Sequence, residues 1–408
     1  MGESEQSARS LNEALARARA SARFTQDEVG LALGVNRAMV SYWESGTRIP
    51  NDRQISALAR LYGIEPADLL EGRLAGPASA DLAGLLLRDG HGIGPDGVIG
   101  IREFVQFLDR FAELCRVTGE PSGRPTQSPF AHRAGYNSRD DARRKAQEVR
   151  AHLGLGSGRL GSIDSACEAF GVTVYQAPHG SDLDSAPAGA VLRHPEAGLS
   201  ILVNHDMSPG RRCFAIAHGI AHALFHSHET SLVLCGDTSQ RERLADLFAG
   251  EFLMPSDGIR RYAEKLGLQP RISDPADIVH IQRHFDVSWP MALVRLHQMN
   301  AITHDTYAEL RTTVQPESLA GALGYPAHRE SDVGGPATSR LERLPRSFLR
   351  MLRQAVAVEA MSPATAASFA GLPVPDIALL ISQPIGNPGR ASPQREAEFR
   401  EFEVTGVV

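Results

Sequence analysis

The sequence predicts a mainly α-helical protein with an α+β domain in its middle. Apolar residues recur at helical spacing in the first seventy residues and again after residue 340. Between these segments, residues 172–204 contain three short β-like runs separated by Gly, Pro, Asp and Ser. At about 100–200 residues per domain, the length of 408 residues predicts two to four domains.

Five short helices are predicted in the first domain, residues 9–73. Leu11, Leu15 and Ala18 share one helix face, and Thr25 forms a capping box with Glu28 at the start of the second helix. Glycines at 34 and 46 and a proline at 50 end the second and third helices. The third helix is expected from Asn36 to Glu44, the fourth from Ile55 to Tyr62, and the fifth from Pro66.

The segment FTQDEVGLALGVNRAMVSYWESGTRIP contains two short helices joined by a turn with glycine, which is helix-turn-helix geometry. Over residues 9–71 the sequence resembles the Cro and lambda-repressor type of regulator, the XRE family. The resemblance implies a five-helix, lambda-repressor-like DNA-binding domain. In such a domain the helix at 36–44 enters the major groove.

The resemblance also implies which residues contact DNA. Arg37, Ala38 and Tyr42 would face base edges, with Ser41 nearby, and Arg37 could pair with a guanine. Gln26 and Asn36 match phosphate-contacting positions, and Thr47 and Arg48 follow the groove helix where backbone contacts are usual. The alternative is a helical bundle that binds protein rather than DNA.

The charge distribution fits local DNA binding. The chain has 42 basic and 48 acidic residues, a net charge of −6. Residues 9–60 contain 8 Arg and 5 acids, a net of +3, so the remainder carries −9. The basic surface is therefore expected to be confined to the first domain, and the acidic bulk should limit non-specific DNA binding.

Residues 74–137 are predicted to be a helical connector and linker. Helices are expected at 82–87 and 101–115, followed by a segment rich in Pro, Gly and Ser at 118–137. Residues 92–97 form G-x-G-x-x-G, but a dinucleotide site requires this pattern after a strand in a βαβ unit. Because the preceding segment has a helical pattern, residues 92–97 are interpreted as a structural turn.

Residues 138–312 are predicted to form the central domain. Helices are expected at 139–153 and 163–170, and strands at 172–176, 189–193 and 199–204. A further helix begins near Ser208 and carries RRCFAIAHGIAHALFH, and a later helix carries RERLADLFAGEFLMP.

These two helices contain a candidate metal centre. His218 and His222 are four residues apart, so both project from one helix face and can bind a single Zn²⁺. Glu242 could supply the third ligand, and Asp246 could orient a ligand histidine. Glu251, in the same helix, is an alternative third ligand. The two glutamates lie on opposite sides of that helix, so only one of them can face the metal.

From about residue 140 to 310, the motifs in this order resemble the ImmA/IrrE family of zinc peptidase-like domains. The resemblance implies a zincin-like domain with a small sheet and a Zn²⁺ cofactor. It also implies an H-E-x-x-H motif whose Glu is the general base. Here that position is Gly219, which cannot accept a proton, so no catalytic residue is assigned.

The loss of this Glu leaves three interpretations open. The domain could be a peptidase with an unusual base, for which His226, His228 and Glu229 are candidates. It could bind zinc and be catalytically silent, acting as a sensor or interaction domain. It could also be a pseudo-site without metal that is kept for its fold.

The C-terminal part is predicted to be helical. Residues 315–342 are expected to be a linker and residues 343–385 a small helical module, either a degenerate helix-turn-helix or a docking bundle. Within the module, helices are expected at 344–358, after a cap at Ser362, and from Pro373. Residues 386–408 are expected to be partly disordered.

Other features favour a cytoplasmic protein with no membrane partner, and the family resemblances imply a bacterial one. No stretch reaches the ~18 apolar residues that span a bilayer, and the first twenty residues have no apolar signal core. The four cysteines include no C-x-x-C pair, so neither a zinc ribbon nor a disulfide framework is indicated.

Together the two resemblances imply a sequence-specific transcription regulator that binds a double-stranded DNA operator as a homodimer. Its central domain, without the general base, is expected to act as a sensor or to bind a protein or peptide partner. One alternative is a zinc-dependent metalloprotease that cleaves a repressor or itself. A second is an antitoxin-like regulator that holds a partner protein.

Overall fold

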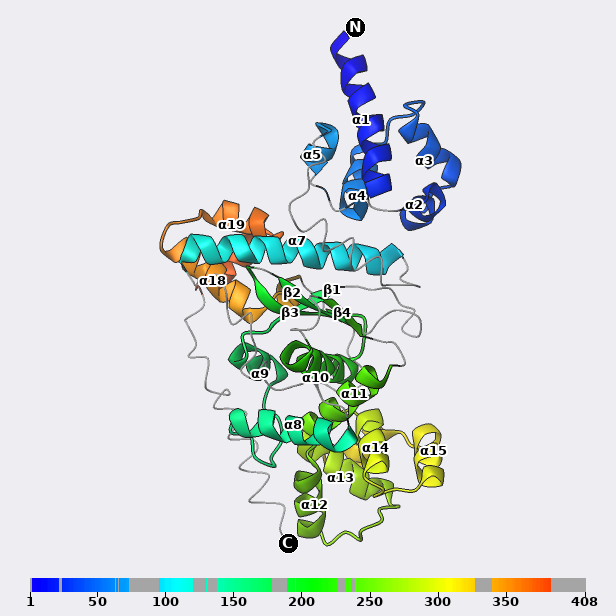
Figure 1. The fold of residues 1–408 in the computed structure, drawn as a ribbon, viewed down its shortest axis with the longest axis vertical. Helices are drawn as coiled ribbons and strands as arrows, with labels where there is room; N and C mark the ends of the chain where they lie inside the picture. The colour runs from blue at the N-terminus through cyan, green and yellow to red at the C-terminus, as the bar shows by residue number, and fades with distance from the viewer. Residues whose placement is uncertain are drawn as a thin grey trace. The chain divides into compact units, whose positions relative to one another are not determined.

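The computed structural model has a mainly α-helical fold with one small sheet (Figure 1). The chain divides into two compact units, Met1–Met351 and Leu352–Val408. The structure describes residues 2–21, 24–62, 64, 66–72, 95–119, 130, 138–177, 189–194, 196–226, 232–235, 239–326 and 340–382. The predicted fold class, mainly α with an α+β central part, is therefore confirmed.

The five predicted N-terminal helices are present. They are α1 (Gly2–Ser21), α2 (Gln26–Leu33), α3 (Arg37–Glu44), α4 (Asp52–Tyr62) and α5 (Pro66–Leu70). The predicted capping box forms, because the backbone N–H of Glu28 donates to Thr25 Oγ1 at 3.2 Å and that of Thr25 donates to Glu28 Oε2 at 2.7 Å. Asn36 caps α3 by accepting from the Met39 backbone at 2.9 Å.

One apolar core holds these helices together. Leu15 of α1, Val40 and Trp43 of α3 and Leu58 of α4 are all nearly fully buried in it. The sequence buries α3 on one face only, so the opposite face of this short helix carries the side chains that the resemblance assigns to DNA.

Helix α7 (Pro95–Thr118) is longer than the predicted helix at 101–115. It begins at Pro95, a favoured first helical position, so residues 95–97 form a helical turn rather than the interpreted loop. Phe107 stacks on Tyr175 with ring centroids 4.5 Å apart and lies 5.1 Å from the ring of Phe348. The predicted helix at 82–87, residues 92–94 and most of 118–137 lie outside the described residues.

The sheet has four strands in the order β1-β3-β2-β4. Its strands are β1 (Thr173–Ala177), β2 (Gly189–His194), β3 (Gly198–Asn204) and β4 (Leu232–Cys235). Strand β3 pairs in parallel with β1 and antiparallel with β2, and β2 pairs antiparallel with β4. The three predicted strands are confirmed to within one residue at each end, whereas β4 was not predicted.

Both faces of the sheet are covered. Every residue of β3 is buried, which fits a strand covered on two sides rather than one. Ile201 and Val203 point into the core that includes α10, whereas Tyr175 and its register partner Leu202 lie on the face that α7 covers (Figure 1). Helix α7 is thus a layer of the central fold as well as a connector.

Four helices after α7 build the rest of the site's scaffold. They are α8 (Arg139–His152), α9 (Ile163–Ala169), α10 (Pro209–Phe225) and α11 (Gln240–Leu253). Each begins after a serine whose side chain accepts a backbone N–H three residues later; these serines are Ser138, Ser162, Ser208 and Ser239. Such caps fix where each helix starts, and therefore which residues share its buried face.

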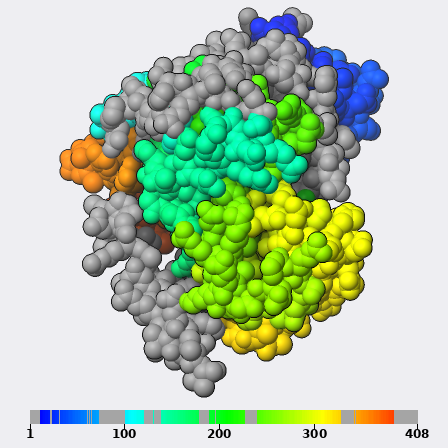
Figure 2. Space-filling model, turned by 60° about the horizontal axis from the view of Figure 1, so that its bottom comes forward, coloured from blue at the N-terminus to red at the C-terminus, as the bar shows by residue number. Residues whose placement is uncertain are grey.

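Five further helices close the central fold. They are α12 (Ser256–Lys265), α13 (Pro275–Phe285), α14 (Trp289–Gln298), α15 (His304–Thr313) and α16 (Pro316–Ala322). Figure 2 shows these helices gathered beside α8 on one face, where Arg261 of α12 donates to Ser157 Oγ at 3.2 Å. The predicted linker at 315–342 is wrong for its first part, because Ala320 of α16 is buried and Glu317 pairs with Arg283 at 2.9 Å.

The C-terminal helices are α17 (Arg340–Arg343), α18 (Arg346–Ala357), α19 (Pro363–Ala370) and α20 (Val374–Ser382). As predicted, Ser362 caps α19, accepting from the Thr365 backbone at 3.0 Å. Residues 386–408 lie outside the described part. Within the described residues no single helix is long and apolar enough to cross a membrane; α19 and α20 pass that test only as a pair bent by 113°.

Candidate metal centre and nucleic-acid interface

The structure brings His218, His222 and Glu242 together between α10 and α11. All three side chains are buried, and their ligand atoms lie within 4.8 Å of one another. The Nε2 atom of His218 lies 3.0 Å from Glu242 Oε2, and that of His222 lies 3.0 Å from Glu242 Oε1. The two Nε2 atoms are also 3.0 Å apart. The helical spacing of four therefore places both rings on one face, as the sequence predicts.

This donor set fits Zn²⁺. Two neutral imidazole nitrogens and one carboxylate are the ligands of many three-residue zinc sites, and donors at ~2.0–2.1 Å from the ion lie about 3.3 Å apart in a tetrahedron. Two imidazole nitrogens and two carboxylate oxygens whose neighbours are 3.0 Å apart repel one another through their lone pairs unless a cation or shared protons lie between them. The residues present are thus suited to hold the metal.

Each histidine has a second partner on its other ring nitrogen. Asp246 Oδ1 lies 2.9 Å from His218 Nδ1, as predicted for a residue that orients a ligand. His226 Nδ1 lies 2.9 Å from His222 Nδ1. These contacts fix both rings with Nε2 toward Glu242.

Burial and pairing shift the pKa values of this cluster. Burial lowers the pKa of His222 below its ordinary value, which favours the neutral ring that binds metals. Burial alone would raise the pKa of Glu242, but the contacts with His218 and His222 outweigh it, so the pKa of this carboxyl lies well below its usual range. The site therefore presents a neutral His222 ring and the carboxylate of Glu242 near neutral pH.

Glu251, the alternative third ligand, lies elsewhere. Its carboxylate forms an ion pair with Arg295, and both side chains are fully buried. It also accepts from the Ser256 hydroxyl at 2.7 Å and from the Gln147 amide at 3.1 Å. Glu251 thus ties α8, α11 and α14 together, and Glu242 is the glutamate at the histidines.

Gly219, at the position of the missing base, faces strand β3. A Cβ atom built on Gly219 would lie 2.9 Å from Ile201 Cγ2 and 3.0 Å from Ile201 Cδ1, closer than real side chains pack. Ile201 is itself buried. Ile201 therefore fills the space that the Cβ atom of any other residue at 219 would occupy. No sequence pattern indicates this contact between the helix and the strand.

The structure does not support His226, one of the three residues considered as a replacement for the general base. His226 contacts the Nδ1 edge of His222, which is the opposite edge of the ring from the ligand atom Nε2. His228 and Glu229 lie outside the described residues.

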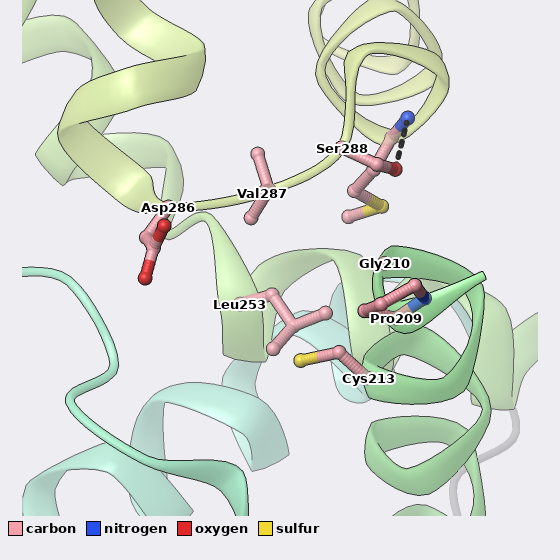
Figure 3. A pocket seen from close by; sticks show the side chains of 8 residues that line it. Pro209, Gly210, Cys213, Leu253, Asp286, Val287 and Ser288 are labelled. Carbon is pink, nitrogen blue, oxygen red and sulfur yellow. Dashed lines mark hydrogen bonds between the residues drawn. The ribbon is translucent and has the colours of Figure 1, made fainter. Parts of the chain in front are cut away.

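A separate small hollow opens at the start of α10. Figure 3 shows Pro209, Gly210 and Cys213 on one side and Leu253 and Val287 on another. A Cβ on Gly210 would lie 2.5 Å from the Cβ of Ser288, so glycine allows the close approach of α10 to the segment before α14. None of the candidate ligands lines this hollow, so it is distinct from the candidate metal centre.

The residues predicted to read DNA bases lie on the outer face of α3. Arg37, Ala38 and Tyr42 are exposed, and Ser41 is half-buried. The Arg37 guanidinium lies 3.8 Å from the carboxylate of Asp27, and both side chains are mostly exposed. This contact of Arg37 with Asp27, which lies in the first turn of α2, was not predicted from the sequence.

The predicted phosphate contacts divide into two kinds. Thr47 and Arg48 are exposed after α3, and Arg48 lies over the ring of Tyr42 at 5.6 Å. Gln26 instead donates to Glu44 at 2.9 Å, and Glu44 also pairs with Arg19 of α1 at 2.5 Å. The Asn36 side-chain oxygen is occupied as the cap of α3. Gln26 and Asn36 therefore also stabilise the local fold.

Comparison with known families agrees with both parts. Residues 167–297, which include all three candidate ligands, match the model of the IrrE N-terminal-like domain, a peptidase family. Residues 15–69 match the model of a helix-turn-helix family. No curated protein matches the chain. The chain thus joins an N-terminal helix-turn-helix domain of the XRE type to an ImmA/IrrE-type peptidase-like domain.

Proposed function

We propose that the chain is a transcription regulator that binds a specific DNA operator as a homodimer. In this proposal the IrrE-like domain holds Zn²⁺ without hydrolysing peptides and acts as a sensor or binds a protein or peptide partner. The observation that carries the non-catalytic part of the proposal is the pair Gly219 and Ile201, because Ile201 fills the space where a side chain at the general-base position would start, next to three candidate zinc ligands.

His218, His222 and Glu242 would hold the metal, and Asp246 would orient His218. The chemistry that Zn²⁺ supplies in such sites is Lewis acidity. Glycine at 219 offers no group to take a proton, and general acid–base catalysis typically contributes ~10²–10⁴-fold. The residues therefore support binding far better than turnover.

Zinc content tests the metal part. We expect the purified chain to bind one Zn²⁺ and His222→Ala to lose it, because two ligands cannot hold the ion as three do. Metal analysis after dialysis gives the stoichiometry, and competition with a chelator gives the affinity. His304→Ala, which removes an exposed histidine, is the matched control. A wild-type chain that takes up no zinc would contradict this part.

Arginine 37 tests the DNA part. Arg37→Ala should weaken operator binding by about 5- to 150-fold at fixed salt, the effect of losing ~1–3 kcal/mol of base discrimination. Binding to unrelated DNA should change much less, because that binding depends on phosphate contacts. Titrations with operator and scrambled duplexes measure both quantities.

Arg271→Ala is the control for Arg37→Ala, since it removes the same charge from an exposed position outside the helix-turn-helix. Equal losses on both duplexes would show that Arg37 contributes charge only. Salt-insensitive binding without sequence preference by the wild-type chain would defeat the regulator proposal itself.

The sensor part is tested by asking whether zinc changes DNA affinity. Operator titrations with the zinc-loaded and the chelator-treated chain, and with His222→Ala, compare the two states directly. A difference in operator affinity between loaded and stripped wild type, absent in His222→Ala, would link the two domains. Identical affinities would leave only a partner-binding role for the peptidase-like domain.

A further inference from the structure

We propose that His226 is a positioning residue that holds His222 in the tautomer that can bind a metal. The inference rests on the proposed zinc site, but concerns a residue outside the ligand set. His218 and His222 lie in α10 and His226 is its C-cap residue, so the three histidines follow one another at steps of four. Neighbouring rings are 4.8 and 5.0 Å apart between centroids.

The contact between His222 and His226 is buried and specific. His222 is fully buried and His226 is 3% exposed. Their Nδ1 atoms are 2.9 Å apart. The backbone N–H of His226 donates to the His222 carbonyl at 2.9 Å, and this hydrogen bond fixes the position of the His226 backbone relative to His222. At that separation the two Nδ1 atoms share one hydrogen, so one ring donates and the other accepts.

The direction of this hydrogen bond decides whether His222 can act as a ligand. If His222 donates from Nδ1, its Nε2 atom keeps a bare lone pair beside Glu242 and His218. If His226 donates, the neutral His222 ring carries its proton on Nε2, where it would donate to Glu242 Oε1 at 3.0 Å. Only the first arrangement leaves a metal ligand.

His226 plays for His222 the part that Asp246 plays for His218. A carboxylate suits the position beside His218, because the Asp246 side chain is 49% exposed to solvent. The position beside His222, which His226 occupies, is buried. A buried carboxylate would be costly there, and a neutral imidazole accepts a hydrogen bond without a charge. The two ligand histidines therefore have different orienting groups that match their different exposure.

The test compares two variants of the full chain. His226→Asn keeps an acceptor near the position of Nδ1, and His226→Leu removes it at similar volume. By chelator competition we expect His226→Leu to bind Zn²⁺ about 10–100-fold more weakly, the usual effect of losing an orienting partner. His226→Asn should retain most of the affinity, and melting temperatures of the metal-free chains report on folding.

A second measurement on the wild-type chain does not depend on either variant. Long-range ¹H–¹⁵N spectra of histidine-labelled, zinc-loaded protein should show the His222 proton on Nδ1 and the His226 proton on Nε2. The reverse assignment overturns the proposal, as does wild-type affinity in a folded His226→Leu. A folded His226→Asn as weak as His226→Leu also overturns it. A wild-type chain that binds no zinc would contradict both this proposal and the metal part of the proposed function. The three outcomes for the tautomers, His226→Leu and His226→Asn would contradict this proposal alone.

Discussion

Gly219→Glu alone should leave the chain without peptidase activity, whereas Gly219→Glu combined with Ile201→Ala should gain about 10²–10⁴-fold over the wild type. That range is the usual contribution of a general base. The single variant fails because the new Cβ would start 2.9 Å from Ile201 Cγ2, so the side chain cannot enter without displacing a buried strand residue. Hydrolysis of labelled peptides by the zinc-loaded variants measures the gain.

Two control variants and a folding measurement isolate the cause. Ile201→Ala alone should gain nothing, because it creates space but no base, and adding His222→Ala should abolish any activity of the double variant. Ile201→Ala is expected to cost about 2–5 kcal/mol in folding free energy, so each variant needs a melting curve. Activity in Gly219→Glu without the second change would show that Ile201 moves aside, and would refute the steric explanation.

Glu251→Ala should destabilise the chain by about 3–5 kcal/mol, because it leaves the guanidinium of Arg295 buried without its counter-charge. Arg295 would keep its hydrogen bonds to the Met254 carbonyl at 2.9 Å and to Ser256 Oγ at 2.8 Å, which do not neutralise it. Denaturant unfolding measures the loss. Asp257→Asn, which breaks an exposed pair with Arg260, is the control and should cost ~1 kcal/mol or less.

The acid side of the stability profile gives a second readout for Glu251. Burial alone would raise its pKa, but Arg295, Ser256 and Gln147 outweigh burial and lower it. A carboxyl with a depressed folded pKa stabilises the fold above its unfolded pKa of ~4.3, and this contribution is lost as the pH falls through the folded pKa. Wild type should therefore lose stability more steeply below pH ~4.3 than Glu251→Ala, and parallel profiles would contradict the assignment.

Much of the fold could be predicted because its elements carry local signals. The capping box at Thr25 and the serine caps mark helix starts, and short β-like runs bounded by Gly, Pro, Asp and Ser mark β1 to β3. Strand β4 has only four residues, too short to show a period, and α16 contributes a single buried residue, Ala320. Both depend on tertiary packing, which a reading of local pattern does not capture.

The candidate metal centre divides in the same way. The spacing of His218 and His222 follows from helix geometry, and the sequence of the later helix offers a glutamate as third ligand. The choice between Glu242 and Glu251 required the structure, because it depends on Arg295, 44 residues further along the chain. The contact of Gly219 with Ile201 joins a helix to a strand, and it likewise has no counterpart in local spacing.

The Gly219–Ile201 contact also constrains how this protein can evolve. Placing an acid at 219 by one substitution would crowd a buried isoleucine, and shortening Ile201 first would open a cavity, so each single substitution is expected to destabilise the fold. A population would have to acquire both changes before selection on activity could act. The two positions are therefore coupled by epistasis, because a side chain at 219 requires a smaller side chain at 201 and neither substitution alone provides both.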